Sequence, residues 1–285
     1  MPIGNAPLSL AYSPCPNDTF IFAAWTRGLL PDAPPVKVVL DDVEALNEAA
    51  REGRYELTKV SYGAIPHLLD RYRILRAGGA LGRGCGPLVV GRPRADGTVP
   101  ALSGLPPHVR IAIPGRLTTA FLLLRLAFGR PIDAVVMRFD RIVDAVARGD
   151  VDAGLIIHES RFTYERAGLA RIADLGEWWE GDTGRPIPLG AILARRDLDG
   201  AAARAIDATI RDSLAFAHRN DAAILPYVRE HAFEMDDDVM RAHIALYVNR
   251  YSSDLGDDGI AAIETLFQVA ATARLIPQGV RPEFV

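Results

Sequence analysis

The chain has 285 residues, enough for one large domain or two domains of ordinary size. Hydrophobic residues make up 49% of it and charged residues 24%, which is typical of a soluble globular protein with a substantial core. The formal net charge of −4 argues against nucleic acid or an anionic membrane as the main partner, because both require a basic surface.

The first hundred residues alternate between strand and helix patterns, which favours an α/β fold. Each helical stretch ends in a glycine, the residue that most often terminates a helix. The predicted strands span 8–12, 36–42 and 55–63, and the predicted helices span 19–28 and 43–53.

The same order of elements returns after residue 108, which indicates two lobes. Predicted strands span 109–113, 135–139 and 151–157, and predicted helices span 120–129 and 140–149. A strand at 191–197 then leads back to the first lobe, followed by helices near 201–219, 222–231, 237–248 and 259–273. We therefore predict a larger discontinuous lobe, 1–100 with 191–285, and a smaller lobe, 101–190. The Gly- and Pro-rich segments 91–108 and 178–190 are the predicted crossovers.

The cysteine count and the N-terminus bear on the cellular compartment. Cys15 and Cys85 are too few for a disulfide framework, which favours a reducing compartment. The N-terminal segment has no basic start and only a short apolar stretch, and no apolar run approaches the roughly 20 residues of a transmembrane helix. We expect an unprocessed cytoplasmic protein.

Polar residues follow the ends of four predicted strands. In open α/β sheets ligands bind outside the carboxyl ends of the strands. If the lobes face each other, these stretches line one cleft. They are Ser13–Asp18, Lys59–Ser61, Pro114–Thr119 and His158–Ser160.

His158 ends an apolar strand, where a histidine is an accessible base at neutral pH. In an extended strand Ser160 lies on the same side as His158, so its hydroxyl is the neighbour expected to orient the imidazole. A structural histidine bonded to backbone is an equal alternative. A metal site is a weaker one, since no second histidine lies three to five residues away.

Two loops offer polar groups to the cleft. The loop before Thr118 and Thr119 opens a helix, so its N–H groups and hydroxyls suit a carboxylate or phosphate, and ordinary helix capping is the alternative. The loop with Ser13, Asn17 and Asp18 forms either a polar wall of the cleft or a capped turn, with Asn17 or Asp18 as the cap.

Several longer motifs together resemble the 1,4-dihydroxy-6-naphthoate synthase family of the futalosine route to menaquinone. They include SPCPNDTFIF, TKVSYGA, GGALGRGCGPLVV, PGRLTTA, GLIIHESRFTY and RPIPLGAILARRDL, and they extend from about residue 8 to the C-terminus. The resemblance implies a two-lobed, type II periplasmic-binding-protein-like clamshell with a central cleft. It also implies a cytoplasmic lyase that splits cyclic dehypoxanthinyl futalosine.

The resemblance assigns roles to particular residues. It makes His158 the general base. It also makes two short segments contact the substrate, namely Lys59, Val60 and Ser61 in one and Thr118, Thr119 and Ala120 in the other. Such a lyase needs no cofactor and no metal, and its partner is a small carboxylate-bearing molecule. A solute-binding protein of the same fold, without chemistry, remains an alternative. The oligomeric state stays open, with a homodimer among the alternatives.

Overall fold

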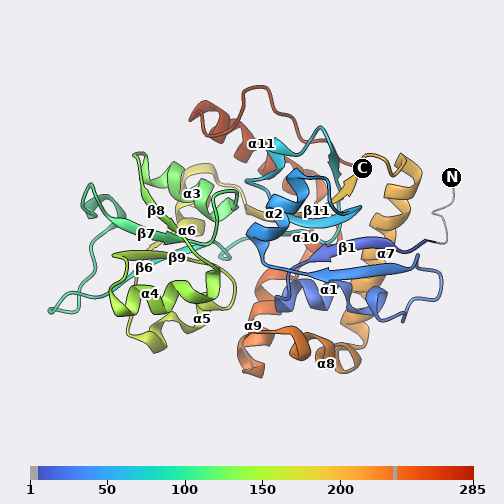
Figure 1. Cartoon of the computed structure of the whole chain (residues 1–285), viewed down its shortest axis with the longest axis horizontal. Coiled ribbons are helices and arrows are strands. Elements are labelled where there is room, and N and C mark those ends of the chain that lie inside the picture. Colours follow the sequence, from blue (N-terminus) through green and yellow to red (C-terminus); the bar gives the residue numbers. More distant parts are fainter. Residues whose placement is uncertain (1–5, 234–235) are drawn as a thin grey trace.

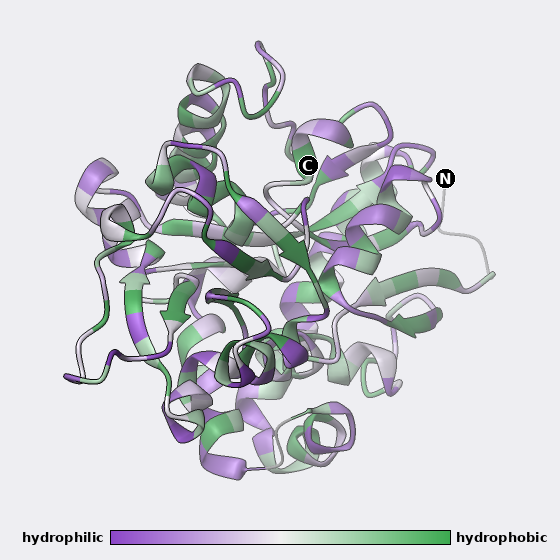
Figure 2. Cartoon of the chain, turned by 60° about the vertical axis from the view of Figure 1, so that its left-hand side comes forward, coloured by the Kyte–Doolittle hydropathy of each residue, from purple (hydrophilic) through white to green (hydrophobic). Residues whose placement is uncertain are grey.

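The computed structural model describes residues 6–233 and 236–285, so the first five residues of the N-terminal segment considered above lie outside it. Two β-sheets lie side by side along the longest axis, each flanked by helices (Figure 1). The strands carry much of the hydrophobic colour in Figure 2. No helix in these two ranges is long and apolar enough to cross a membrane.

The larger sheet has the strand order β2-β1-β3-β11-β4, and β5 also pairs with β11. Strand β1 runs parallel to β2 and β3, so these strands end at the same edge. Strand β11 is antiparallel to β3, β4 and β5. The strands are β1 (Leu8–Tyr12), β2 (Val36–Leu40), β3 (Leu57–Ser61), β4 (Tyr72–Ile74), β5 (Ala80–Gly82) and β11 (Ile187–Arg195).

The smaller sheet has the order β10-β6-β9-β7-β8. Strand β7 is parallel to β8 and β9, whereas β6 is antiparallel to β9 and β10. The strands are β6 (Leu88–Gly91), β7 (Arg110–Ile113), β8 (Asp133–Val136), β9 (Ala153–Ile156) and β10 (Ala170–Asp174). We call the larger sheet with its helices the larger lobe, and the smaller sheet with its helices the smaller lobe.

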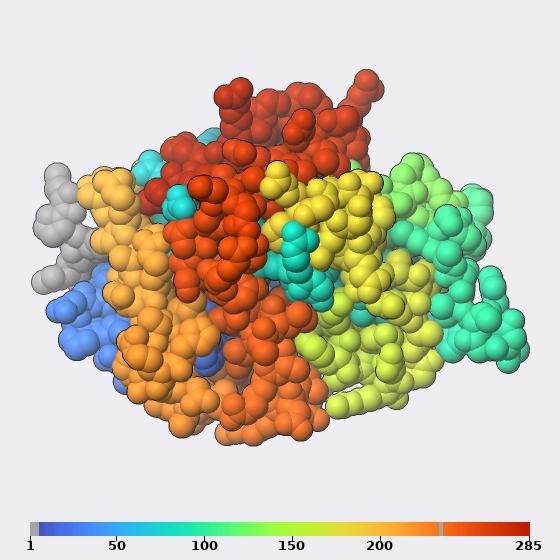
Figure 3. Space-filling model, turned by 180° about the vertical axis from the view of Figure 1, so that it is seen from behind, coloured from blue at the N-terminus to red at the C-terminus, as the bar shows by residue number. Residues whose placement is uncertain are grey.

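Helices flank both sheets (Figure 1). Those of the smaller lobe are α3 (Thr119–Phe128), α4 (Ile142–Arg148), α5 (Ser160–Thr163) and α6 (Leu175–Thr183). The others are α1 (Pro16–Thr26), α2 (Val43–Arg51), α7 (Gly200–Arg219), α8 (Asp221–His231), α9 (Asp237–Tyr247), α10 (Arg250–Ser253) and α11 (Gly256–Thr272). Seen from behind, the C-terminal helices, orange to red in Figure 3, form much of the surface of the larger lobe.

The sheets divide the chain differently from the predicted lobe boundaries. Strand β6 belongs to the smaller sheet, so the chain enters that lobe between β5 and β6 and not within 91–108. Segment 91–108 instead connects β6 with β7 inside the smaller sheet. The return through the segment before β11 agrees with the second predicted crossover. The first boundary was misplaced because β5 and β6 are too short to show a strand period.

Backbone N–H groups of each lobe donate to side chains of the other lobe. The Gly63 N–H, after β3, donates to the Thr119 hydroxyl of α3 at 3.0 Å. The Leu117 N–H donates to the Glu44 carboxylate of α2 at 3.0 Å. These contacts hold the lobes in a closed arrangement.

Replacing Gly63 with alanine is expected to separate the lobes and to lower the free energy of unfolding. A methyl group there would lie 2.9 Å from the Leu117 carbonyl oxygen and 3.0 Å from two Thr118 backbone atoms, which cannot swing aside. Overpacking of this kind costs about 1–3 kcal/mol. Denaturant unfolding and small-angle scattering measure the two effects. Gly181→Ala is the control, since a methyl group there meets nothing within 4 Å, and equal behaviour of the two variants would contradict the prediction.

Candidate functional site

A cavity of about 90 Å³ lies between the lobes, and every predicted site residue lines it. The loop after β1 and the end of β3 contribute one wall. The start of α3 and the segment after β9 contribute the opposite wall. The predicted residues are Ser13, Asn17, Asp18, Lys59, Val60, Ser61, Thr118, Thr119, Ala120 and His158.

His158 occupies a sharp turn between β9 and α5. Its φ angle is +56°, in the left-handed region, and its ring packs edge-on against Phe139 with 4.9 Å between centroids. The chain is therefore not extended from His158 to Ser160, and the prediction that Ser160 orients the imidazole is wrong. In the two described ranges, neither ring nitrogen of His158 has a hydrogen-bond partner.

The His158 side chain is half-buried, and desolvation inside the cavity decides the charge of its imidazole. Desolvation is the main cause that lowers the pKa of His158 to about 4. The Asp18 carboxylate raises the pKa and the Lys59 ammonium lowers it, each by a smaller amount. His158 is consequently neutral at pH 7, the form that accepts a proton.

We expect the protein to lose stability as the pH falls from about 6.5 towards 4.5. His158 and the buried His243 both have pKa values below that of a free histidine, chiefly because of burial. In this window the unfolded chain binds protons that the folded chain does not, so the free energy of unfolding rises with pH. Each histidine contributes up to about 1.4 kcal/mol per pH unit.

Denaturant unfolding at a series of pH values measures this slope. The double variant His158→Asn, His243→Asn is expected to flatten it between pH 4.5 and 6.5. An unchanged slope would assign the acid sensitivity to other groups.

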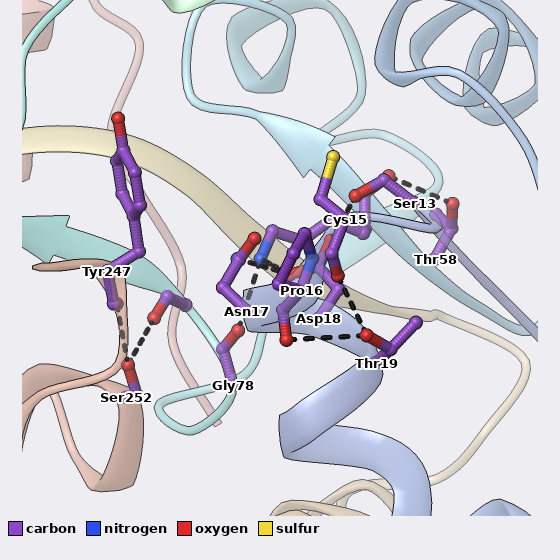
Figure 4. A network of polar contacts seen from close by, with 12 residues as sticks. Ser13, Cys15, Pro16, Asn17, Asp18, Thr19, Thr58, Gly78, Tyr247 and Ser252 are labelled. Atoms are coloured by element: carbon purple, nitrogen blue, oxygen red, sulfur yellow. Dashed lines mark hydrogen bonds and ion pairs between the residues drawn. The ribbon is translucent and has the colours of Figure 1, made fainter. Parts of the chain in front are cut away.

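A buried ion pair forms the floor on the larger-lobe side. Lys59 Nζ lies 2.6 Å from Asp18 Oδ1, and the side chains are 7% and 2% exposed. Asp18 also accepts hydrogen bonds from the Ser13 hydroxyl at 2.7 Å and from the Asn17 amide at 2.8 Å. Figure 4 shows Ser13, Asn17 and Asp18 clustered at the start of α1. This loop therefore forms a polar wall of the cavity, as one of the two interpretations predicted.

The capping interpretation of the same loop is wrong. The N-cap of α1 is Cys15, which makes no side-chain capping bond, and Asn17 and Asp18 lie within the first turn. Proline is favoured at the first position of a helix, so α1 begins at Pro16 and its N-cap is the preceding residue, Cys15.

The two threonines of α3 have their hydroxyls committed to the protein. Thr118 accepts from the Phe121 N–H at 3.2 Å and donates to the Gly115 carbonyl at 2.9 Å, which is ordinary capping. Thr119 accepts from Gly63 and donates to the Leu189 carbonyl at 2.7 Å. What this helix start offers a ligand is therefore its first N–H groups, which have no intrahelical partner.

Two residues of α9, His243 and Tyr247, line the cavity and were not predicted as site residues. The His243 ring lies nearly parallel to that of His158, with 6.3 Å between centroids. The sequence signal was present, since His243 falls four residues before Tyr247, on the buried face of α9. Its distance in sequence from the other site residues concealed it.

Cys15, His158 and Glu159 place their potential ligand atoms within 4.8 Å of one another. In the sequence, metal ligands were sought only a few residues apart in the chain. This group was missed because Cys15 lies in the other lobe, far from His158 in the sequence. Burial raises the pKa of the Cys15 thiol well above its usual value, and Glu159 raises it further. A protonated thiol is neither a nucleophile nor a metal ligand.

Comparison with known proteins identifies the family. A family model described as menaquinone biosynthesis matches residues 8–272. The 1,4-dihydroxy-6-naphthoate synthase of Thermus thermophilus is 51% identical over 278 residues, which cover 98% of this chain and 99% of the relative. The synthase of the same name from Streptomyces coelicolor is 46% identical over 275 residues, 95% of each chain.

Solved structures identify the fold. A crystal structure from Archaeoglobus fulgidus matches with a TM-score of 0.87 and 37% identity, over 95% of this chain and 98% of that one. The alkanesulfonate-binding protein of Xanthomonas axonopodis matches with a TM-score of 0.72 and 16% identity, over 96% and 95%. This last likeness concerns the fold alone, and it confirms the predicted periplasmic-binding-protein-like architecture. Because the family model and both synthases match nearly the whole chain, this protein belongs to the menaquinone biosynthesis family.

Proposed function

We propose that this chain is a 1,4-dihydroxy-6-naphthoate synthase, a carbon–carbon lyase that releases the naphthoate from cyclic dehypoxanthinyl futalosine. Two relatives that bear the synthase name are 46% and 51% identical over almost the full length. The observation that carries the proposal is a neutral imidazole, His158, in a cavity that the other lobe lines with an ion pair and hydroxyls.

The reaction begins when His158 takes a proton from the sugar-derived part of the substrate. The released electron pair moves toward the ring system, the carbon–carbon bond to the sugar fragment breaks, and the second ring becomes aromatic. The electron pair of the broken bond ends on the ring system, so the imidazolium then returns its proton to an oxygen of the ring product. Atoms and electrons balance without an oxidant or reductant. A positioned general base contributes about 10²–10⁴-fold to such a step.

The cavity walls hold the substrate at both ends. The N–H groups at the start of α3, around Thr119 and Ala120, bind the substrate's carboxylate, because a helix N-terminus favours an anion. Ser61 of β3 faces them from the larger lobe. Its hydroxyl accepts from the Asn47 amide at 3.2 Å and keeps its own proton to donate. Lobe closure then excludes water from the reacting atoms.

Solute binding without chemistry is the competing function of this fold. The two sulfonate-binding structures share 14% and 16% identity with this chain, far less than the synthases do. The polar wall would serve a binding protein equally well, so the close relation to the two synthases favours the reaction.

The decisive assay incubates the purified protein with cyclic dehypoxanthinyl futalosine and no added cofactor. Liquid chromatography with mass spectrometry follows the naphthoate, and one naphthoate is expected for each substrate consumed. Tight binding of the substrate with no product would favour the solute-binding function and overturn the proposal.

A further inference from the structure

His243 has a defined tautomer because of its neighbours in the larger lobe. Its Nε2 lies 3.0 Å from the Asn17 Oδ1, and the Asn17 amide nitrogen donates to Asp18 at 2.8 Å. The ion pair with Lys59 in turn fixes Asp18. Since Asn17 presents its oxygen to His243, the ring carries its proton on Nε2 and a lone pair on Nδ1.

The Nδ1 atom has no hydrogen-bond partner among the described residues, although His243 is only 1% exposed. A buried acceptor left unpaired is costly, and such groups in folded proteins call for an explanation. His243 lines the central cavity beside His158, and the centroid of the Tyr247 ring lies 4.6 Å from that of His243. Burial, with smaller effects from His158 and Lys59, lowers its pKa well below the usual value, so Nδ1 stays an acceptor.

We propose that His243 Nδ1 accepts a hydrogen bond from a hydroxyl group of the bound substrate and product, which makes His243 a second ligand-contacting residue beside His158. This inference rests on the proposed function and adds to it. The start of α3 offers only donors and suits the carboxylate, whereas Nδ1 is only an acceptor and suits a hydroxyl. The two ends of the ligand are thereby distinguished.

Two variants separate the ring nitrogens. His243→Gln places an amide nitrogen near the Nε2 position, where it donates to Asn17, and leaves no acceptor at Nδ1. His243→Asn places its amide near the Nδ1 position and gives up the bond to Asn17. Each variant is first checked for cooperative thermal unfolding.

Anaerobic titration calorimetry then compares two ligands. One is 1,4-dihydroxy-6-naphthoate, and the other is 2-naphthoate, which keeps the rings and the carboxylate but has no hydroxyl. His243→Gln is expected to weaken binding of the dihydroxy ligand about tenfold and to leave 2-naphthoate unchanged. His243→Asn is expected to retain more of the affinity for the dihydroxy ligand. Equal losses for both ligands, or no loss, would overturn the inference.

Failure of wild-type protein to bind either ligand would instead count against the proposed function. A second readout needs no variant. In protein labelled with ¹⁵N-histidine, the unprotonated Nδ1 signal of His243 is expected to shift with the dihydroxy ligand and not with 2-naphthoate. A protonated Nδ1 in the free protein, or an unchanged signal, would overturn the inference.

Discussion

Replacing His158 with asparagine is expected to lower kcat by about 10²–10⁴-fold, the usual contribution of a general base. An amide cannot accept the proton that the imidazole takes. Asparagine is also well tolerated by the backbone, because φ at this position is +56° and asparagine is enriched among the non-glycine residues of the left-handed region. Loss of activity would therefore report on the base and not on misfolding.

The control is His108→Asn, at an exposed position in the segment between β6 and β7. It is expected to leave kcat unchanged. The wild-type pH profile supplies a further check, since a His158 pKa of about 4 predicts that kcat/KM stays level from pH 8 to about 5. A kcat near the wild-type value for His158→Asn would remove His158 from the catalytic step.

The sequence predicts those elements that are long enough to show a period. Strand β1 and helices α7, α8 and α9 lie within one or two residues of the predicted ranges. Strands β4 and β5 have three residues each, and neither was predicted. Strand β8 begins two residues earlier than predicted because its residues are only partly buried and carry a weak pattern.

The residues of the candidate site that come directly after strands could be predicted from the sequence. Residues after β1, at the end of β3, before α3 and after β9 line one cavity because parallel strands present their carboxyl ends to the same edge. His243 was not predictable in this way, since α9 reaches the cavity only through tertiary packing. The bonds that use up the Thr118 and Thr119 hydroxyls likewise depend on contacts that no local pattern reveals.

Replacing Lys59 with methionine is expected to lower the free energy of unfolding by about 3–5 kcal/mol, the cost of removing one partner of a buried ion pair. The substitution keeps the length and packing of the side chain but leaves the Asp18 carboxylate buried without its cation. It also removes the hydrogen bond from Lys59 Nζ to the Gly78 carbonyl at 3.3 Å. Denaturant unfolding at pH 7 measures the loss.

Lys37→Met is the matched control, because Lys37 is exposed on β2 and is the only other lysine in the chain. It is expected to change stability little. Adding Asp18→Asn to Lys59→Met is expected to recover part of the stability, since the uncompensated charge is then gone. Recovery would show that Lys59→Met destabilises the protein mainly because it leaves the Asp18 carboxylate buried without a cation. If Lys59→Met alone left the free energy of unfolding almost unchanged, solvent would have to reach Asp18. The ion pair would then not hold Asn17 in place, and Asn17 would not set the tautomer of His243.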